Sequence, residues 1–309
     1  MSNLPNPSVE CVNLQKCLAN YLLSLKEGER ILSTRELADA YGASLGSISS
    51  ALNDLEEMGA VVIHRRGRLG SFLGKKSLGI LWKITGNGPM VIALTLPSFP
   101  KCEGLATAIY SLLDDAGIET YLIFIRGSYN RLKALRNGRC HATIMSALAA
   151  EELCDENEEI ILRLPPQSFV TDHRVFYRRS QGQGSQPLRV GIDRDSFDIK
   201  YLTELEFAGN EVEYHQVTFT QSDLHLANSG VDAAISNLDH LERIKSTEFT
   251  SRPLSPKVQA MIGDRDTCAV LVIRAGTDAA KIVLQGVLDQ NTILTIQQKV
   301  VDGLMVPRY

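Results

Sequence analysis

Residues 33–73 constrain the fold of this chain more than any other stretch. They open on Ser33-Thr-Arg-Glu36, a capping box in which the serine hydroxyl and the glutamate carboxylate satisfy amide groups at the start of a helix. Gly42 suits a turn, Ser44 is placed to cap a second helix, and Gly59 is placed to end it. The spacing therefore predicts a helix-turn-helix.

A basic hairpin follows these helices. An apolar strand at 61–63, a loop at 64–70 and a return strand at 71–73 predict a two-stranded wing. Such a cluster of cations can neutralise phosphates and release counterions from a nucleic acid, although a basic hairpin can also be ordinary solvated surface. Residues 61–78 contain no acidic residue and five basic ones, namely Arg65, Arg66, Arg68, Lys75 and Lys76.

The stretch at 31–73 resembles the winged helix-turn-helix of the GntR family of bacterial regulators. The resemblance implies that the helix after Ser44 lies in the major groove of double-stranded DNA. The matching positions are Arg35-Glu36-Leu37-Ala38, Tyr41-Gly42-Ala43-Ser44, Ala51-Leu52, Leu55-Glu56, Gly59, Arg65-Arg66 and Gly70-Ser71-Phe72. The implied DNA-contacting residues are Arg35, Ser44, Leu45, Ser47, Ser49, Arg65, Arg66, Arg68 and Gly70.

The chain departs from the GntR pattern at the positions that usually read bases. Leu45 and Ser49 stand where the family usually has arginines, so two bidentate guanine contacts are missing. The arginine of the wing tip is shifted to Arg68, with Leu69 in its usual place, and Leu32 replaces a proline. These changes keep open a second interpretation, in which the wing mediates protein interaction or dimerisation.

From residue 90 onward, apolar strands alternate with helical segments in two successive copies, at about 90–164 and 188–244. This order predicts mainly parallel sheets with helices on both faces. An extended segment at 174–178 and a strand at 268–274 connect the copies, and helices near 278–288 and 292–301 end the chain. The pattern resembles the type II periplasmic-binding-protein fold, which also forms the effector domain of LysR-type regulators.

The predicted fold is therefore α/β, with an N-terminal winged helix-turn-helix and a C-terminal two-lobed domain like that of type II periplasmic binding proteins. The whole layout resembles that of the YhfZ-type regulators. The predicted domains are a DNA-binding domain at 1–78, a linker at 79–89 and an effector-binding domain at 90–309, with lobe 1 at about 90–170 and 265–309 and lobe 2 at about 175–262.

Open α/β lobes bind ligands at the carboxyl ends of their strands, beside helix N-termini. Serines at these positions could present amides to a carboxylate or phosphate, although each could also be an ordinary helix cap. Arg126 and Arg174 could pair with an anion, but lone arginines usually lie on the surface. The candidate ligand-binding residues are Thr95, Ser98, Phe99, Ser128, Ser146, Ala147, Asp193, Ser196 and Ser236.

Composition favours a cytoplasmic protein. The first residues lack the apolar core of a signal peptide, and no apolar run reaches the roughly 20 residues that cross a bilayer. Six cysteines with no C-x-x-C spacing are typical of free thiols. The net charge of −4 argues against a globally basic nucleic-acid binder but leaves room for a local basic patch.

An enzyme is the rival class, but the histidines are dispersed and no H-E-x-x-H, G-x-S-x-G or P-loop motif is present. We therefore predict no catalytic residues, no metal site and no cofactor. The sequence favours a transcriptional regulator that binds double-stranded DNA as a homodimer and responds to a small polar or anionic molecule, with no membrane association.

Overall fold

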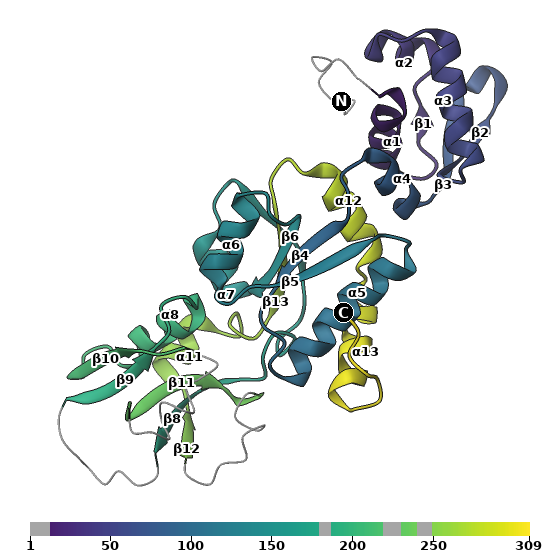
Figure 1. Cartoon of the computed structure of the whole chain (residues 1–309). Helices are drawn as coiled ribbons and strands as arrows, with labels where there is room; N and C mark the ends of the chain where they lie inside the picture. The colour runs from purple at the N-terminus through teal and green to yellow at the C-terminus, as the bar shows by residue number, and fades with distance from the viewer. Residues whose placement is uncertain (1–12, 179–186, 219–229, 240–248) are drawn as a thin grey trace. The chain divides into compact units, whose positions relative to one another are not determined.

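The computed structural model describes residues 13–178, 187–218, 230–239 and 249–309 (Figure 1). Parts of the second predicted β-α-β copy lie outside these residues. The chain forms two compact units. One consists of residues up to 90 together with 112–121 and 276–289, and the other holds the remaining segments from 91 onward.

The N-terminal unit contains the predicted helix-turn-helix and wing. Ser33 Oγ accepts a hydrogen bond from Glu36 N at 3.2 Å, and a Glu36 carboxylate oxygen accepts from Ser33 N at 2.7 Å, so the capping box is confirmed. The elements are α1 (Leu14–Ser24), β1 (Arg30–Ile31), α2 (Thr34–Tyr41), α3 (Leu45–Glu57), β2 (Val61–Arg65), the 3-10 turn η1 (Gly67–Leu69) and β3 (Ser71–Lys76), with sheet order β1-β3-β2.

Apolar side chains of α1, α2, α3 and β3 form the core of this module. Burying such leucine and isoleucine side chains stabilises the fold by roughly 1.5–3 kcal/mol each relative to exposure. The completely buried residues include Leu18, Leu22, Leu37, Ile48, Leu55 and Leu73. The short β1 strand, which the sequence did not predict, pairs with β3 and closes the wing sheet.

The predicted linker is not an extended segment. Residues Leu78–Thr85 form helix α4, which Ser77 caps and Gly86 ends in a left-handed conformation. Helix α4 packs against α1 and against α12 (Asp278–Val287). The sequence does not predict this helix, because α4 is apolar on most of its surface and lacks the alternation of apolar and polar faces that marks a helix. Leu81 and Trp82 are buried.

The rest of the chain forms two five-stranded sheets. The first has the order β5-β4-β6-β13-β7, and the second has the order β10-β9-β11-β8-β12. The strands of the first are β4 (Met90–Leu94), β5 (Thr120–Phe124), β6 (Ala142–Ser146), β7 (Glu158–Arg163) and β13 (Ala269–Arg274). Those of the second are β8 (His173–Arg178), β9 (Leu188–Ile192), β10 (Val212–Gln216), β11 (Ala233–Asn237) and β12 (Phe249–Pro253).

Each sheet contains one strand that runs against its neighbours. Strand β13 is antiparallel to β6 and β7, and β8 is antiparallel to β11 and β12, whereas β4–β6, β9–β10 and β9–β11 are parallel pairs. The reversed strands are the two crossing segments, each of which enters a sheet after leaving the other half of the chain. This arrangement confirms the two-lobed, periplasmic-binding-protein-like fold.

Helices flank the two sheets (Figure 1). Strands β6 and β11 are buried along their whole length, as expected for strands covered on both faces. The described helices of this region are α5 (Pro100–Asp115), α6 (Ser128–Arg136), α7 (Ala147–Leu153), α8 (Phe197–Glu206), α11 (Pro256–Ile262) and α13 (Gln290–Val301). Helix α11 and strand β12 were not predicted.

The structure also tests the sequence predictions about the cysteines and about membrane-spanning helices. Cys102, Cys140, Cys154 and Cys268 are free thiols, but Cys17 is disulfide-bonded, so the expectation that all cysteines are free is wrong. None of the helices in the described part of the chain is long and apolar enough to span a membrane.

The fit of α4 gives a test of the fold. A Cβ atom added to Gly79 would lie 2.1 Å from the carbonyl oxygen of Ala116. Because backbone atoms cannot move aside cheaply, we expect Gly79→Ala to lower the free energy of unfolding by about 1–3 kcal/mol. Chemical denaturation followed by circular dichroism measures this change.

Gly46 provides the matched control, because it is the second residue of α3 as Gly79 is of α4. A Cβ atom at Gly46 would meet only Ser44 Oγ, at 3.8 Å. Gly46→Ala should therefore leave stability unchanged or raise it by about 0.5–1 kcal/mol. Equal effects of the two substitutions would contradict the packing described for α4.

Candidate functional site

The N-terminal end of α3 is an exposed polar edge. Ser44 caps the helix by accepting from Ser47 N at 3.0 Å, and its hydroxyl lies 2.8 Å from that of Ser47. Ser49 is exposed one turn further on, and Leu45 is 55% exposed. The helix therefore presents hydroxyls and one leucine where a base-reading helix usually presents charged donors.

Several predicted cations are exposed. Arg35 lies in the first turn of α2, and no described residue forms an ion pair or side-chain hydrogen bond with it. Arg68 lies in the 3-10 turn at the tip of the wing, which Gly70 ends with a positive φ of 94°. The Arg66 guanidinium stacks over the ring of Phe72 at 5.1 Å. These groups remain accessible to phosphates.

Two of the five basic residues of the wing are already engaged within the protein. Arg65 Nη2 donates to a Glu56 carboxylate oxygen at 2.5 Å and to Asn53 at 3.1 Å. Lys76 Nζ donates to the carbonyls of Leu23 and Leu25, both at 2.6 Å, and burial lowers its pKa despite nearby glutamates. The charge that the hairpin can offer a partner is therefore smaller than its composition indicates.

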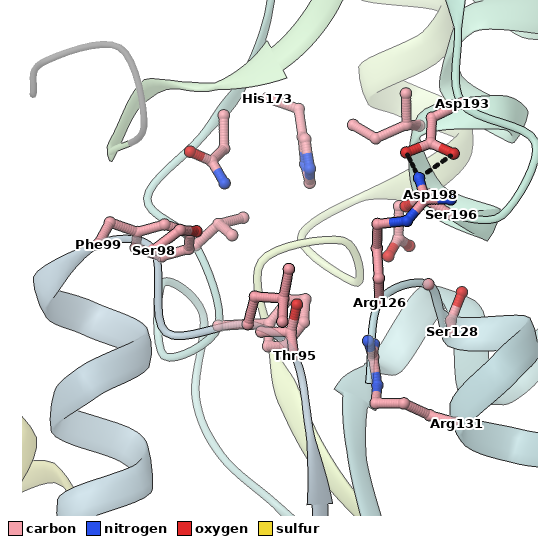
Figure 2. Close-up of a pocket in the computed structure, with 16 residues that line it drawn as sticks. Thr95, Ser98, Phe99, Arg126, Ser128, Arg131, His173, Asp193, Ser196 and Asp198 are labelled. Carbon is pink, nitrogen blue, oxygen red and sulfur yellow. Dashed lines mark hydrogen bonds and ion pairs between the residues drawn. The ribbon is translucent and has the colours of Figure 1, made fainter. Parts of the chain in front are cut away.

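A second site is a cleft, open to solvent, in the C-terminal unit (Figure 2). Its walls come from the loops after β4, β5 and β9 and from the start of β8. Apolar side chains at Leu96, Phe99, Phe169, Val170 and Ile199 line it together with polar and charged groups. Six of the predicted ligand-binding residues line this cleft, namely Thr95, Ser98, Phe99, Ser128, Asp193 and Ser196.

The two lobes meet beside the cleft through Arg126. Its guanidinium forms an ion pair with Asp193 at 3.1 Å and a second with Asp195 (Figure 2 shows the first). Asp193 also accepts from Asp195 N at 3.0 Å. The backbone approach is close, since a Cβ on Gly127 would lie 2.3 Å from the Asp195 carbonyl oxygen. Glycine is thus required for this lobe contact.

Ser128 adds a second contact between the lobes. Its Oγ accepts from Phe197 N, at the start of α8, over 3.0 Å. The helix α6 itself begins at Ser128 and has no side-chain cap, and α8 has none from Ser196 either. Ser128 and Ser196 therefore do not cap their own helices; Ser128 instead accepts from the first amide of α8, and the start of α6 has no side-chain cap.

A buried polar cluster forms part of the cleft wall. Arg131, 3% exposed, donates through Nε to the Ile144 carbonyl at 3.0 Å and through Nη1 to the Ile125 carbonyl at 3.1 Å. Burial lowers the pKa of Arg131 to about 10, against the opposing charge of Asp198. Burial raises the pKa of Asp198, although Ser146 Oγ donates to it at 2.6 Å.

His173 brings an ionisable group to the cleft from the second lobe. The side chain is almost completely buried, and Nδ1 lies 2.7 Å from a carboxylate oxygen of Asp266. Burial alone would lower the pKa of His173, but the hydrogen bond and charge of Asp266, with Asp198 and Asp172, raise it overall. The Asp266 carboxylate thus favours a proton on Nδ1 and stabilises the imidazolium form.

Three predicted ligand-binding residues lie outside the cleft lining: Ser146, Ala147 and Ser236. Ser146 and Ala147 are completely buried, and Ser146 caps α7 besides donating to Asp198. Ser236 Oγ is buried, and none of the described residues forms a hydrogen bond with it. Arg174 pairs with Asp172 at 3.1 Å and also lies outside the lining. Residues that sequence reasoning left out of the predicted set, but that line the cleft, include Arg126, Arg131, His173, Asp198 and Asn237.

A helix-turn-helix followed by a periplasmic-binding-protein-like domain is the architecture of a one-component transcriptional regulator. The family model of the YhfZ C-terminal domain matches residues 79–309, and that of a helix-turn-helix domain matches residues 26–73. Protein YhfZ of Escherichia coli K12 is 32% identical over 293 residues, which cover 94% of this chain and 95% of that protein. The chain therefore belongs to the YhfZ family.

Solved structures are similar as well. The crystal structure of YhfZ from Shigella flexneri matches with a TM-score of 0.61 and 29% identity, over 75% of this chain and 98% of that one. An ancestral arginine-binding protein bound to arginine matches with a TM-score of 0.49 and 14% identity, over 69% of this chain and 98% of that one.

The His173–Asp266 pair predicts a pH dependence of stability. Because the folded pKa of His173 is raised, its contribution to stability is present at low pH and is lost as pH rises through that pKa. We expect Asp266→Asn to remove this dependence and to cost roughly 1–3 kcal/mol at acidic pH, where the imidazolium loses its carboxylate partner. Chemical denaturation at several pH values from about 6 to 8 measures both effects.

Asp264→Asn is the matched control, because Asp264 is exposed two residues away. This variant should keep the wild-type pH slope. An unchanged slope in Asp266→Asn would show that Asp266 does not hold the proton on His173.

Proposed function

We propose that this protein is a ligand-responsive transcriptional regulator whose winged helix binds double-stranded DNA. The observation that carries the proposal is the helix-turn-helix at 26–73, whose α3 N-terminus is exposed beside a cationic wing. We assign the helix-turn-helix to the GntR type on the motifs from Arg35 to Phe72. The protein acts in the cytoplasm, where its DNA is.

Phosphate contacts dominate this mode of binding. Arg35, Arg66, Arg68 and Lys75 are exposed cations that can approach the DNA backbone, whereas α3 offers Ser44, Leu45, Ser47 and Ser49 to the bases. Hydroxyls and a leucine discriminate bases less strongly than the bidentate arginines of related helices. Two wings in a homodimer, each on one half-site, would compensate for the modest contacts of a single wing.

The cleft receives the signal that the wing reports. A small molecule between the lobes would add contacts to the Arg126 and Ser128 bridges and favour the closed arrangement. Strand β13 leads to α12 through only Ala275, Gly276 and Thr277, and α12 belongs to the compact unit that contains the wing. A short stretch of chain therefore connects the lobes to the unit that contains the wing. Movement of the lobes on ligand binding would change the DNA affinity of that unit by linkage.

The exposed cations give a direct test. We expect the triple substitution of Arg35, Arg66 and Arg68 by Ala to weaken DNA binding and to reduce the slope of log K against log salt by roughly 0.9 per lost contact. Fluorescence anisotropy with DNA from upstream of the protein's own operon measures both quantities.

The control replaces Lys133, Arg139 and Lys257, three exposed cations of the other compact unit, by Ala. It removes the same charge without touching the wing, so its salt slope should match that of the wild type. An equal loss in both triple variants would indicate binding through overall charge instead of through the winged helix.

The Arg65–Glu56 pair gives a second test. Glu56→Gln keeps the acceptor for Ile63 N but removes the charge that engages Arg65, so Arg65 becomes available to phosphates. We expect DNA affinity to rise by roughly threefold to tenfold, since one charge-assisted contact is gained. The same anisotropy titration at low salt measures the change.

Glu57→Gln is the control. Glu57 is the exposed neighbour of Glu56, and its substitution removes the same negative charge. If both substitutions raise affinity equally, general electrostatics explains the effect and Arg65 has no specific part in it.

A second candidate function is supported by two exposed apolar side chains, one at the start of α3 and one at the tip of the wing. Leu45 is 55% exposed and Leu69 is 69% exposed, at positions where cations are usual. Such residues suit a protein partner or a dimer contact. Light scattering of Leu45→Ser and Leu69→Ser decides between the functions: loss of a dimer with intact DNA binding favours the interaction role, and loss of DNA binding alone favours the regulator.

A further inference from the structure

Two buried basic side chains line the cleft, Arg131 and His173, and each has one nitrogen to which no residue in the described part of the chain bonds. Arg131 uses Nε and Nη1 for the carbonyls of Ile144 and Ile125, and no residue that the structure describes accepts from Nη2. A buried guanidinium is costly unless an anion compensates its charge, and burial favours the neutral form of Asp198, the acid whose charge acts on Arg131. Arg131 lines the cleft, so an anion from solvent can reach it.

His173 lines the same cleft from the second lobe (Figure 2). Its Nδ1 is paired with Asp266, and within the described part of the chain no group bonds to Nε2. When Nδ1 carries the proton and donates it to Asp266, the neutral imidazole presents a lone pair at Nε2, whereas the imidazolium presents an N–H donor there. Protonation therefore converts His173 from an acceptor into a donor toward the cleft.

The remaining charges of the cleft do not supply the missing anion. Asp193 is paired with Arg126 and with the amide of Asp195. Asp198 accepts from Ser146, and burial favours its neutral form. The N-terminus of α6, which has no side-chain cap, adds positive potential at the cleft.

The organic part of a ligand has an apolar surface to meet. Leu96, Phe99, Phe169, Val170 and Ile199 line the cleft beside the polar groups. A bare inorganic anion would leave these side chains in contact with water, so the lining favours a carbon skeleton that carries an anionic group.

We propose that the cleft binds a small organic acid whose carboxylate is recognised by Arg131 and His173. This inference rests on the proposed ligand-binding role of the cleft and adds the class of ligand. Recognition strengthens as pH falls, because only the imidazolium of His173 donates to a carboxylate. The ionisable and charged groups that surround His173 are Asp266, Asp198, Asp172 and Arg131, and Asp266 is the group that sets the tautomer.

Thermal unfolding of the full chain with matched probes tests the inference. The probes are butyrate, succinate and benzoate, each compared at millimolar concentration with its neutral amide, namely butyramide, succinamide and benzamide. We expect at least one acid to raise the melting temperature while its amide does not, and the affinity of that acid to fall as pH rises from about 6 to 8.

Variants identify the residues. Arg131→Gln should weaken the binding of that acid by about 10- to 100-fold, as expected for loss of a charge-assisted contact. Because Arg131 is buried and its variant could misfold, His173→Gln is the second variant: it should retain weaker binding with no pH dependence. His141→Gln is the matched control, because His141 is a partly buried histidine outside the cleft lining.

The melting results distinguish the proposed class of ligand from the proposed role of the cleft as a ligand site. Stabilisation by an amide as strong as by its acid, or acid binding unaffected in both the Arg131 and His173 variants, would overturn the ligand class while leaving the cleft a ligand site. Identical melting with every probe would count against the cleft itself. DNA binding is measured separately and is unaffected by either result.

Discussion

The two strands that cross between the lobes are the constraint on which the C-terminal unit depends. Strand β13 enters the first sheet between β6 and β7, and β8 enters the second between β11 and β12. Each is hydrogen-bonded on both sides, so neither lobe can form without a strand that follows the other half of the chain. The loops after β4, β5 and β9 then meet at one cleft, where Arg126 and Ser128 join the lobes.

Charge is used differently in the two candidate sites. On the wing, the cations are exposed, so each has a small desolvation cost and each ion pair contributes little free energy. The ion pair between Glu56 and Arg65 reduces the positive charge that the wing can offer a partner. In the cleft, burial makes each charge costly, so nearly every charged side chain is paired. The Arg131 and His173 nitrogens that face the cleft are therefore the groups from which we infer an anionic ligand. The functions proposed above therefore use charge in two ways, with exposed cations on the wing for a polyanion and buried groups in the cleft for one small anion.

Local signals in the sequence predicted local structure well. The capping box at Ser33 and the cap at Ser44 depend on residues three apart, so the sequence shows both partners at once. The rhythm of apolar strands and the two crossing segments were sufficient to predict the two-lobed fold. Six cleft residues followed from the rule that ligands bind after the carboxyl ends of strands.

Long-range partners were beyond the sequence. Asp266 lies 93 residues from His173, and Asp198 lies 52 residues from Ser146, so no spacing reveals either pair. Ser146 therefore looked like a ligand contact, although it is buried under Asp198. The antiparallel direction of β13 and the helical linker at Leu78–Thr85 also depend on packing that only the folded chain supplies.

We propose that the winged helix binds DNA and that the remainder of the chain controls this binding. A gel shift of the full-length wild-type protein with DNA from upstream of its own operon, at low and at physiological ionic strength, tests this proposal. We expect a discrete complex that weakens steeply as salt increases, because phosphate contacts dominate. Failure to form any complex at low ionic strength would contradict it.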